Sequence, residues 1–178
     1  GTNYFALDLY AYILFPSTIT AVELAGVIRY LDENTNATKN PVGSLLNYWQ
    51  ARGDIVTFKF DALDFSGVTN AKQTWWGTSS LTSFPSTIDL SNVTDFESSW
   101  LFCSSLTSFP PLDLSSGTNF DHAWRGCTSL TSFPALDLSA GTNFSHAWRG
   151  CTSLATFSAI PLTAGLNFTR AWQECTAM

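Results

Sequence analysis

Four cysteines recur every 24 residues along the last two thirds of the chain, and a tryptophan stands three positions before each of them. The cysteines are Cys103, Cys127, Cys151 and Cys175, and the tryptophans are Trp100, Trp124, Trp148 and Trp172. A tandem period of about 20 to 50 residues is the signature of a solenoid, in which each repeat contacts mainly its neighbours. The stacked repeats present one extended surface, and such a surface usually binds another molecule and seldom catalyses a reaction.

The repeat unit is clearest in two adjacent copies, LTSFPPLDLSSGTNFDHAWRGCTS from Leu106 and LTSFPALDLSAGTNFSHAWRGCTS from Leu130. A copy from Leu81 is one residue longer, an upstream copy from Leu63 is degenerate, and the last copy, from Leu154, diverges from the others. We therefore count about five units of 24 to 25 residues.

Each unit has two parts. The first ends in the alternating Leu136 and Leu138, a period of two that predicts a short strand. In the second, Phe144, Trp148 and Cys151 follow the spacing of one stripe of a short helix or 3₁₀ turn. An asparagine or aspartate precedes this stripe, where its side chain can cap the first turn; these capping residues are Asp95, Asn119, Asn143 and Asn167. The unit is thus predicted to be strand, turn, short helix, turn.

The blocks CSSLTSFP and DLSNVTDF and the pattern F-x-x-A-W-x-x-C-x-S-L resemble the BspA-like leucine-rich repeats of bacterial surface proteins. The resemblance is to the shorter version of that repeat, with phenylalanine and tryptophan where methionine is usual, and it covers roughly residues 56–178. It implies an α/β repeat, a right-handed leucine-rich-repeat solenoid, found on bacterial surfaces or in phage tail-associated proteins and used for adhesion and recognition. The family has no common catalytic residues to transfer.

The composition of the chain argues against nucleic acid as a binding partner and against a membrane-spanning segment. The formal net charge is −6 and the chain has 8 Lys and Arg residues, which argues against nucleic acid because phosphate binding needs clustered cations. No segment approaches the roughly 18 apolar residues of a membrane span, and no secretory signal peptide is visible.

Residues 1–55 lie outside the repeats. The alternation from Tyr4 to Phe15 predicts a strand, a capping box at Thr20 and Glu23 opens a predicted helix, and residues 44–52 are predicted to form a second short helix. We interpret this region as an α/β cap over the first coil of a solenoid at residues 56–178, with a separate docking element as the alternative. At the other end, Trp172 and Cys175 would be uncovered, so either the chain continues or another subunit buries them.

The cysteine and tryptophan columns favour a structural interpretation. One cysteine per coil lacks the paired spacing of a zinc site, and parallel side chains about 5 Å apart do not suit a disulfide. We predict buried free thiols and a buried tryptophan ladder; a carbohydrate-stacking platform is the alternative for the tryptophans. Trp76 departs from the repeat pattern and is the better candidate for an exposed, ligand-binding aromatic residue.

His122 and His146, with Arg125 and Arg149, are copied positions in adjacent repeats. Because they obey the repeat and no third group is attached to orient a base, we interpret them as a solvated helical face and not as a catalytic site. No metal site is predicted from these residues.

Four aspartates form the most suggestive row: Asp64, Asp89, Asp113 and Asp137. Each lies between two inward-facing apolar residues and should point outward. Like charges stacked about 5 Å apart need compensation, which nearby Ser or Thr hydroxyls or backbone N–H groups would supply. A Ca²⁺ ion bridging the carboxylates, or a cationic ligand, is the alternative.

The sequence as a whole predicts a non-enzymatic recognition or adhesion module, without a cofactor, that is extracellular, on a cell surface or on a virion. Its partner would be a protein or glycan on a cell surface, bound through the aspartate row. The alternative is a structural subunit of an assembly, such as a phage tail or capsid accessory protein, with homo-oligomer contacts through the C-terminal coil.

Overall fold

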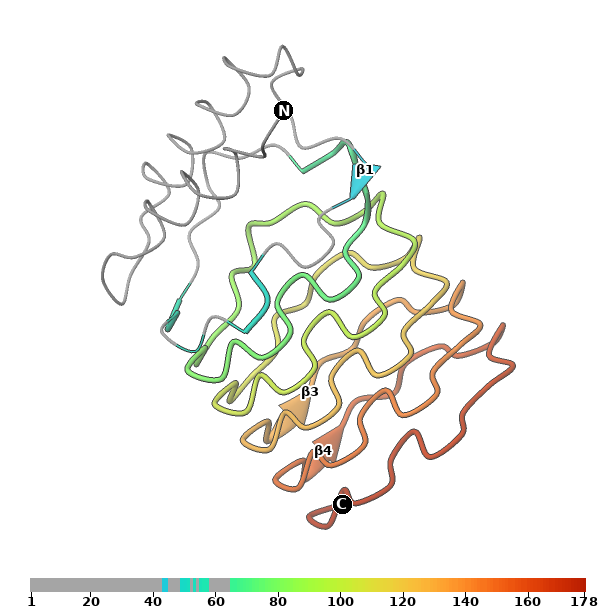
Figure 1. Cartoon of the computed structure of the whole chain (residues 1–178). Helices are drawn as coiled ribbons and strands as arrows, with labels where there is room; N and C mark the ends of the chain where they lie inside the picture. The colour runs from blue at the N-terminus through green and yellow to red at the C-terminus, as the bar shows by residue number, and fades with distance from the viewer. Residues whose placement is uncertain (1–42, 45–48, 52, 54, 58–64) are drawn as a thin grey trace, which may run out of the picture.

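The computed structural model describes residues 43–44, 49–51, 53, 55–57 and 65–178. Figure 1 shows the described chain as a stack of similar coils that ends at the C-terminus. The predicted strand at residues 4–15, the predicted helix from Thr20 and most of the predicted cap lie outside the described residues. No helix in the described ranges is long and apolar enough to cross a membrane.

Successive coils are joined in parallel register by very short strands. Strand β1 (Gly43–Ser44) pairs with β2 (Val68–Asn70), and β3 (Ser132–Phe133) pairs with β4 (Thr156–Phe157). Isolated parallel bridges link equivalent positions of the other coils: Asn70–Asp95, Asp95–Asn119, Asn119–Asn143, Asn143–Asn167, Ser83–Ser108 and Ser108–Ser132. Equivalent residues of neighbouring repeats therefore lie side by side.

The segment predicted to be a short helix or 3₁₀ turn is a run of tight turns. From Phe144 onward, alternate N–H groups donate to the next coil, such as Trp148 to Ala171 O at 2.9 Å, while those between them close turns within the coil, such as Cys151 to Trp148 O at 3.1 Å. A helix would use every N–H within the segment. Because half of them bond the neighbouring coil, the segment is not a continuous helix. The bonds within the coil join residues three apart, as in the 3₁₀ turn that was the other prediction for this segment.

The position of the strands also differs from the sequence prediction. Leu136 and Leu138 are buried on either side of the exposed Asp137, as an alternating strand requires, but the ladder bonds form at Ser132–Phe133. Pro134 has no N–H to donate, and the N–H of Ser139 bonds the Asp137 side chain instead of a neighbouring coil. The segment stays extended without pairing.

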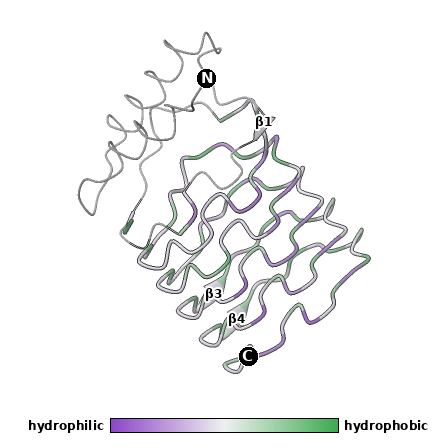
Figure 2. Cartoon of the chain, viewed as in Figure 1, coloured by the Kyte–Doolittle hydropathy of each residue, from purple (hydrophilic) through white to green (hydrophobic). Residues whose placement is uncertain are grey.

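Aromatic columns form the core. Trp75, Trp100, Trp124 and Trp148 are fully buried, with near-parallel rings whose centroids lie 5.2–5.4 Å apart. A column of phenylalanines meets their rings edge to face, as Phe133 does with Trp124 at 4.9 Å. Figure 2 shows hydrophobic and hydrophilic stretches recurring at similar places around successive coils. Neighbouring coils thus bury the same residues against one another.

The tryptophan column extends beyond the predicted repeats. Trp49 is 3% exposed and its ring stacks on Trp75 at 5.9 Å. The backbone N–H of Trp49 donates to Thr74 O, and the backbone N–H of Ala51 donates to Trp76 O. The other coils also donate from alternate backbone N–H groups to the next coil. Residues 49–51 therefore form a coil turn and not the predicted second helix, and Ser44 belongs to β1.

The last coil is less covered than the others. Phe168, Trp172 and Cys175 are half-buried, whereas their equivalents one coil earlier are fully buried. Leu166 is 86% exposed. Further chain or another molecule would be needed to bury these side chains.

Candidate functional site

The aspartate row lies on the outside of the coils. Asp89, Asp113 and Asp137 are exposed, and each stands between two buried residues. In each coil, Oδ1 of the aspartate accepts a 3.0 Å hydrogen bond from the N–H of the serine two residues later. The hydroxyls of Ser91 and Ser115 also donate to Oδ1, at 2.7 and 2.6 Å. Each carboxylate is therefore held in a fixed orientation by its own turn.

These bonds compensate the stacked negative charges. The hydroxyl and N–H of Ser115 lower the pKa of Asp113, and the charge of Asp137 opposes this effect. Ser139 lowers the pKa of Asp137 in the same way. Serine hydroxyls and backbone N–H groups thus supply the compensation that the sequence predicted, in the coils that the structure describes.

The remaining candidates for ligand binding are not brought together with this row. Asp64 lies outside the described residues. Trp76 is half-buried and occupies the repeat position of Arg125 and Arg149, half a repeat away from the position of Asp137. The structure therefore places Trp76 on a different row from the aspartates.

The cysteines line the core as thiols. Cys103, Cys127 and Cys151 are free and fully buried, and Cys175 is free and half-buried. Each Sγ donates to the backbone carbonyl of the tryptophan one coil earlier, as Cys127 does to Trp100 O at 3.2 Å. Burial raises the pKa of Cys103 and of Cys151 to about 12. The fully buried thiols of Cys103, Cys127 and Cys151 therefore stay protonated and unreactive while the core is closed.

A second row of polar side chains, formed by one asparagine or aspartate from each coil, crosses the stacked coils. Asn119 Nδ2 donates to Asp95 Oδ1 at 3.0 Å, and Asn143 Nδ2 donates to Asn119 Oδ1 at 3.1 Å. The same two oxygens also accept from the backbone N–H two residues later, Asp95 Oδ1 from Glu97 and Asn119 Oδ1 from Asp121. These side chains cap turns, as the sequence predicted for helix ends, and they also tie one coil to the next.

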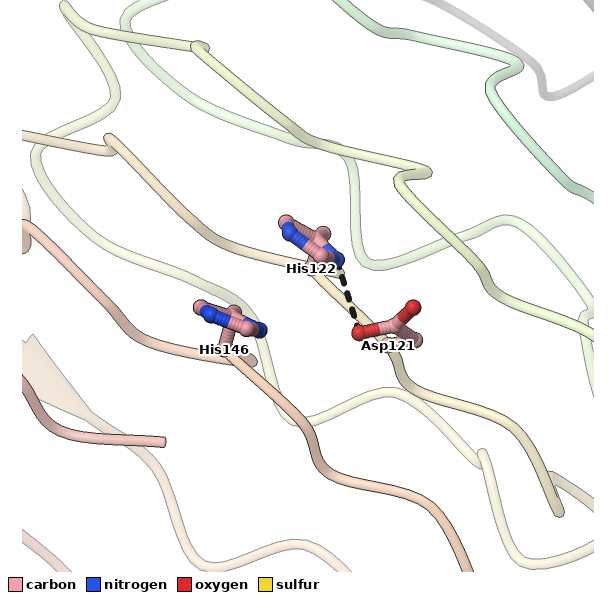
Figure 3. Close-up of side chains that lie close together, drawn as sticks. All are labelled: Asp121, His122 and His146. Carbon is pink, nitrogen blue, oxygen red and sulfur yellow. Dashed lines mark ion pairs between the residues drawn. The ribbon is translucent and has the colours of Figure 1, made fainter. Parts of the chain in front are cut away.

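Asp121, His122 and His146 meet just beyond this row. His122 Nδ1 lies 2.7 Å from Asp121 Oδ1, and the two imidazole rings stack with centroids 4.5 Å apart and planes 15° apart. Figure 3 shows the two rings parallel, with the Asp121 carboxylate beside their edges. One potential ligand atom from each residue lies within 4.8 Å of the other two, and in the described ranges this is the one group of three His, Cys, Asp or Glu side chains so arranged.

The electrostatic surroundings of this cluster are mixed. Burial is the main cause that lowers the pKa of His146, with contributions from His122, Arg149 and Arg125, while Asp121 opposes them. Ser145 Oγ lies 2.9 Å from His146 Nδ1. The imidazole of His146 is therefore held in its neutral form more strongly than an isolated histidine would be.

Sequence reasoning placed His122 and His146 on a solvated helical face and did not connect them with Asp121. The structure makes all three half-buried, and the turn brings Asp121 beside both rings. A signal was present: the position of His146 holds Gln73, Ser98, His122 and Arg170 in the other coils, whereas the tryptophan position is constant. A position that holds different residue types in different repeats, while the core tryptophan stays constant, is a surface position at which the fold does not require one residue type.

Comparison of the chain with protein-family models, curated proteins and solved structures finds no match. The resemblance to BspA-like repeats, and the right-handed leucine-rich-repeat class that it implies, stay predictions. The site must therefore be judged on its own geometry.

Proposed function

We propose that the chain is a non-enzymatic recognition or adhesion module that binds a protein or glycan through its repeat surface. The observation that supports this most directly is the exposed row of Asp89, Asp113 and Asp137, repeated once per coil. Such a module would act extracellularly, on a bacterial surface or on a phage particle.

The fixed orientation of the row favours binding. Each carboxylate uses Oδ1 to accept the bonds within its turn, and Oδ2 has no hydrogen-bond partner among the described residues. A partner with hydroxyl, amide or cationic groups at a similar spacing would meet several acceptors at once. Because the carboxylates are already ordered, binding would cost little additional conformational entropy.

The threonine hydroxyls that follow the aspartates in each coil are less available than the carboxylates to bind a partner. Thr118 Oγ1 donates to Thr94 O, and Thr142 Oγ1 donates to Thr118 O, both at 3.1 Å. These threonines therefore spend their donors on holding coils together. The carboxylates, with an unpartnered oxygen each, are the groups of the repeat surface best placed to accept hydrogen bonds from another molecule.

The test compares the chain with a variant carrying Asp89→Asn, Asp113→Asn and Asp137→Asn. Binding of the labelled proteins to a glycan array and to whole bacterial cells is measured at increasing concentration. A variant with Asp95→Asn, Glu97→Gln and Glu174→Gln removes the same charge from other rows and serves as the control. We expect saturable binding that the first variant loses and the control keeps. Absence of saturable binding, or equal loss in both variants, would contradict the proposal.

One observation favours a structural subunit as a second candidate. The half-buried Phe168 and Trp172 and the exposed Leu166 form an apolar coil end that further chain or another subunit would cover. Light scattering at several concentrations separates the two functions. A defined oligomer supports the assembly subunit, for example in a phage tail or capsid, and a stable monomer supports the binding module.

A further inference from the structure

Three side chains of types that can bind a metal ion lie close together across the boundary between two coils. Asp121 and His122 come from one coil and His146 from the next, and one potential ligand atom from each lies within 4.8 Å of the others. The side chains of Asp121 and His122 are 27% and 26% exposed, while Asp121 Oδ1, the oxygen beside His122, is buried and accepts no hydrogen bond. In Figure 3 the carboxylate lies beside the nitrogen-bearing edges of both rings.

The fold does not require histidine at these two positions. Each histidine occupies the third residue of a hydrogen-bonded turn, with φ of 58° at His122 and 55° at His146. The same corner has a similar positive φ at Gln73, Ser98 and Arg170 in the other coils. Since the backbone accepts glutamine, serine and arginine there, the imidazoles are not a conformational necessity of the turn.

We propose that Asp121, His122 and His146 bind one divalent transition-metal ion, with Zn²⁺ as the representative, through one carboxylate oxygen and two imidazole nitrogens. Imidazole nitrogen suits zinc, copper and nickel, whereas Ca²⁺ and Mg²⁺ prefer sites made of oxygen ligands. Three protein ligands leave a fourth position of a tetrahedral ion open to water or to a partner's side chain.

The required geometry is within reach of side-chain rotation. Zinc lies about 2.0–2.2 Å from nitrogen and carboxylate oxygen, so two ligand atoms at a tetrahedral angle are separated by about 3.3–3.6 Å. One ligand atom from each residue lies within 4.8 Å of the other two, so the cluster closes by up to about 1.5 Å when the ion binds. The two stacked rings must also rotate about χ1 and χ2 until a nitrogen of each points at the ion, and because the side chains are half-buried and not locked in the core they can make this movement.

The nearby cations are already engaged. Arg149 pairs with Glu174 at 2.8 Å, and the Arg125 guanidinium lies 5.6 Å from the centre of the Phe102 ring. On the N-terminal side, Lys72 pairs with Glu97 at 2.7 Å. Their charges are directed to these partners, which reduces their repulsion of a bound metal ion.

A metal ion at this position would link two neighbouring coils. It would join side chains that are otherwise connected by ring stacking and by backbone bonds such as His122 N to Ser145 O at 2.8 Å. Because the ion binds the folded arrangement and not the separated coils, it would raise the melting temperature.

The test is a calorimetric titration of the full chain with Zn²⁺, in a Cys175→Ser background that removes the half-buried thiol as a competing ligand. We expect one ion per chain. His146→Gln installs the residue that the first coil carries at this corner, and Asp121→Ser installs the residue of the following coil. Each should weaken Zn²⁺ binding by at least about tenfold, because even outer-shell changes cost about 10- to 100-fold. Arg170→Gln, at the same corner of the last coil, is the matched control and should bind normally.

A second readout uses the same Cys175→Ser background with both histidines present. The chain contains 2 histidines, so the imidazole signals in an NMR titration with Zn²⁺ report on His122 and His146 alone. Both sets of signals should shift to saturation at one equivalent. Absence of Zn²⁺ binding, imidazole signals that do not move, or binding that persists within about twofold in His146→Gln would overturn the proposal.

Discussion

Replacing Trp124 by alanine tests the aromatic core most directly. Trp124 is fully buried between Trp100 and Trp148, each at 5.4 Å, and meets Phe109 and Phe133 edge to face at 5.3 and 4.9 Å. Truncating a buried tryptophan costs about 3–5 kcal/mol, and aromatic contacts on every side place this residue toward the upper part of that range.

One term opposes this loss. The indole Nε1 of Trp124 is buried and has no hydrogen-bond partner. An unsatisfied buried donor costs about 1–3 kcal/mol, so removing it returns part of the lost stability. We therefore expect a net destabilisation of about 2–4 kcal/mol for Trp124→Ala.

Trp172→Ala is the matched control within the same column. Trp172 is half-buried and stacks on one tryptophan, Trp148, at 5.4 Å. Its loss should cost about 1–2 kcal/mol, since less apolar surface returns to water. Urea denaturation followed by far-UV circular dichroism measures both variants. If the two substitutions lowered the free energy of unfolding equally, the assignment of Trp124 to a closed core would be refuted.

Three further predictions concern smaller groups. Ser115→Ala removes the hydroxyl bond, which is the main cause that lowers the pKa of Asp113, and keeps the backbone N–H bond. Wild type should therefore exceed the variant in unfolding free energy above about pH 4 and lose this advantage as the pH falls through the folded pKa of Asp113, measured by denaturation at pH 6 and pH 3. An advantage that grew on acidification would contradict the sign. Cys175 should react with a thiol reagent in the folded chain, while Cys103, Cys127 and Cys151 should react only on unfolding; four equally fast thiols would show an open core. Gly126→Ala should destabilise the fold more than Gly150→Ala, because an added Cβ would lie 2.4 Å from Phe102 Cδ1 at Gly126 but 3.8 Å from its nearest neighbour at Gly150. The backbone strain is the same at both positions, where φ is 73° and 75°. Thermal melts that ranked the two variants in reverse would contradict this packing.

The period of the sequence predicted which residues form the buried columns. A constant Trp and Cys position every 24 residues can be buried in the same way only if each coil repeats the last. Trp100, Trp124 and Trp148 and the cysteines that follow them are indeed buried. Apolar spacing alone could not distinguish a short helix from consecutive turns, because both bring Phe144, Trp148 and Cys151 to one side. The distinction depends on where the intervening N–H groups find acceptors, which is a property of the neighbouring coil.

The aspartate row was accessible from sequence, but the histidine cluster was not. Asp113 and Asp137 lie between leucines, so alternation assigns them to the outside without knowledge of the turn. Asp121 and His146 are 25 positions apart, and they meet because the parallel register of the coils brings the two turns side by side, each with a positive φ at its histidine. A helical interpretation of that segment put the same residues on a different surface.

The direction of the bonds between coils has a consequence for the length of the array. Cys127 Sγ and Thr118 Oγ1 both donate to carbonyls of the preceding coil, and Cys151 and Thr142 do the same one coil later. The two coils that contain Thr118 with Cys127 and Thr142 with Cys151 therefore bring their own donors and offer equivalent acceptors to the coil that follows, whereas Leu166 replaces this threonine in the last coil. A duplicated copy of residues 106–129 would find all of its partners already in place. The chain can gain or lose whole coils without redesign of any contact, and the length of its outer face changes in steps of one coil.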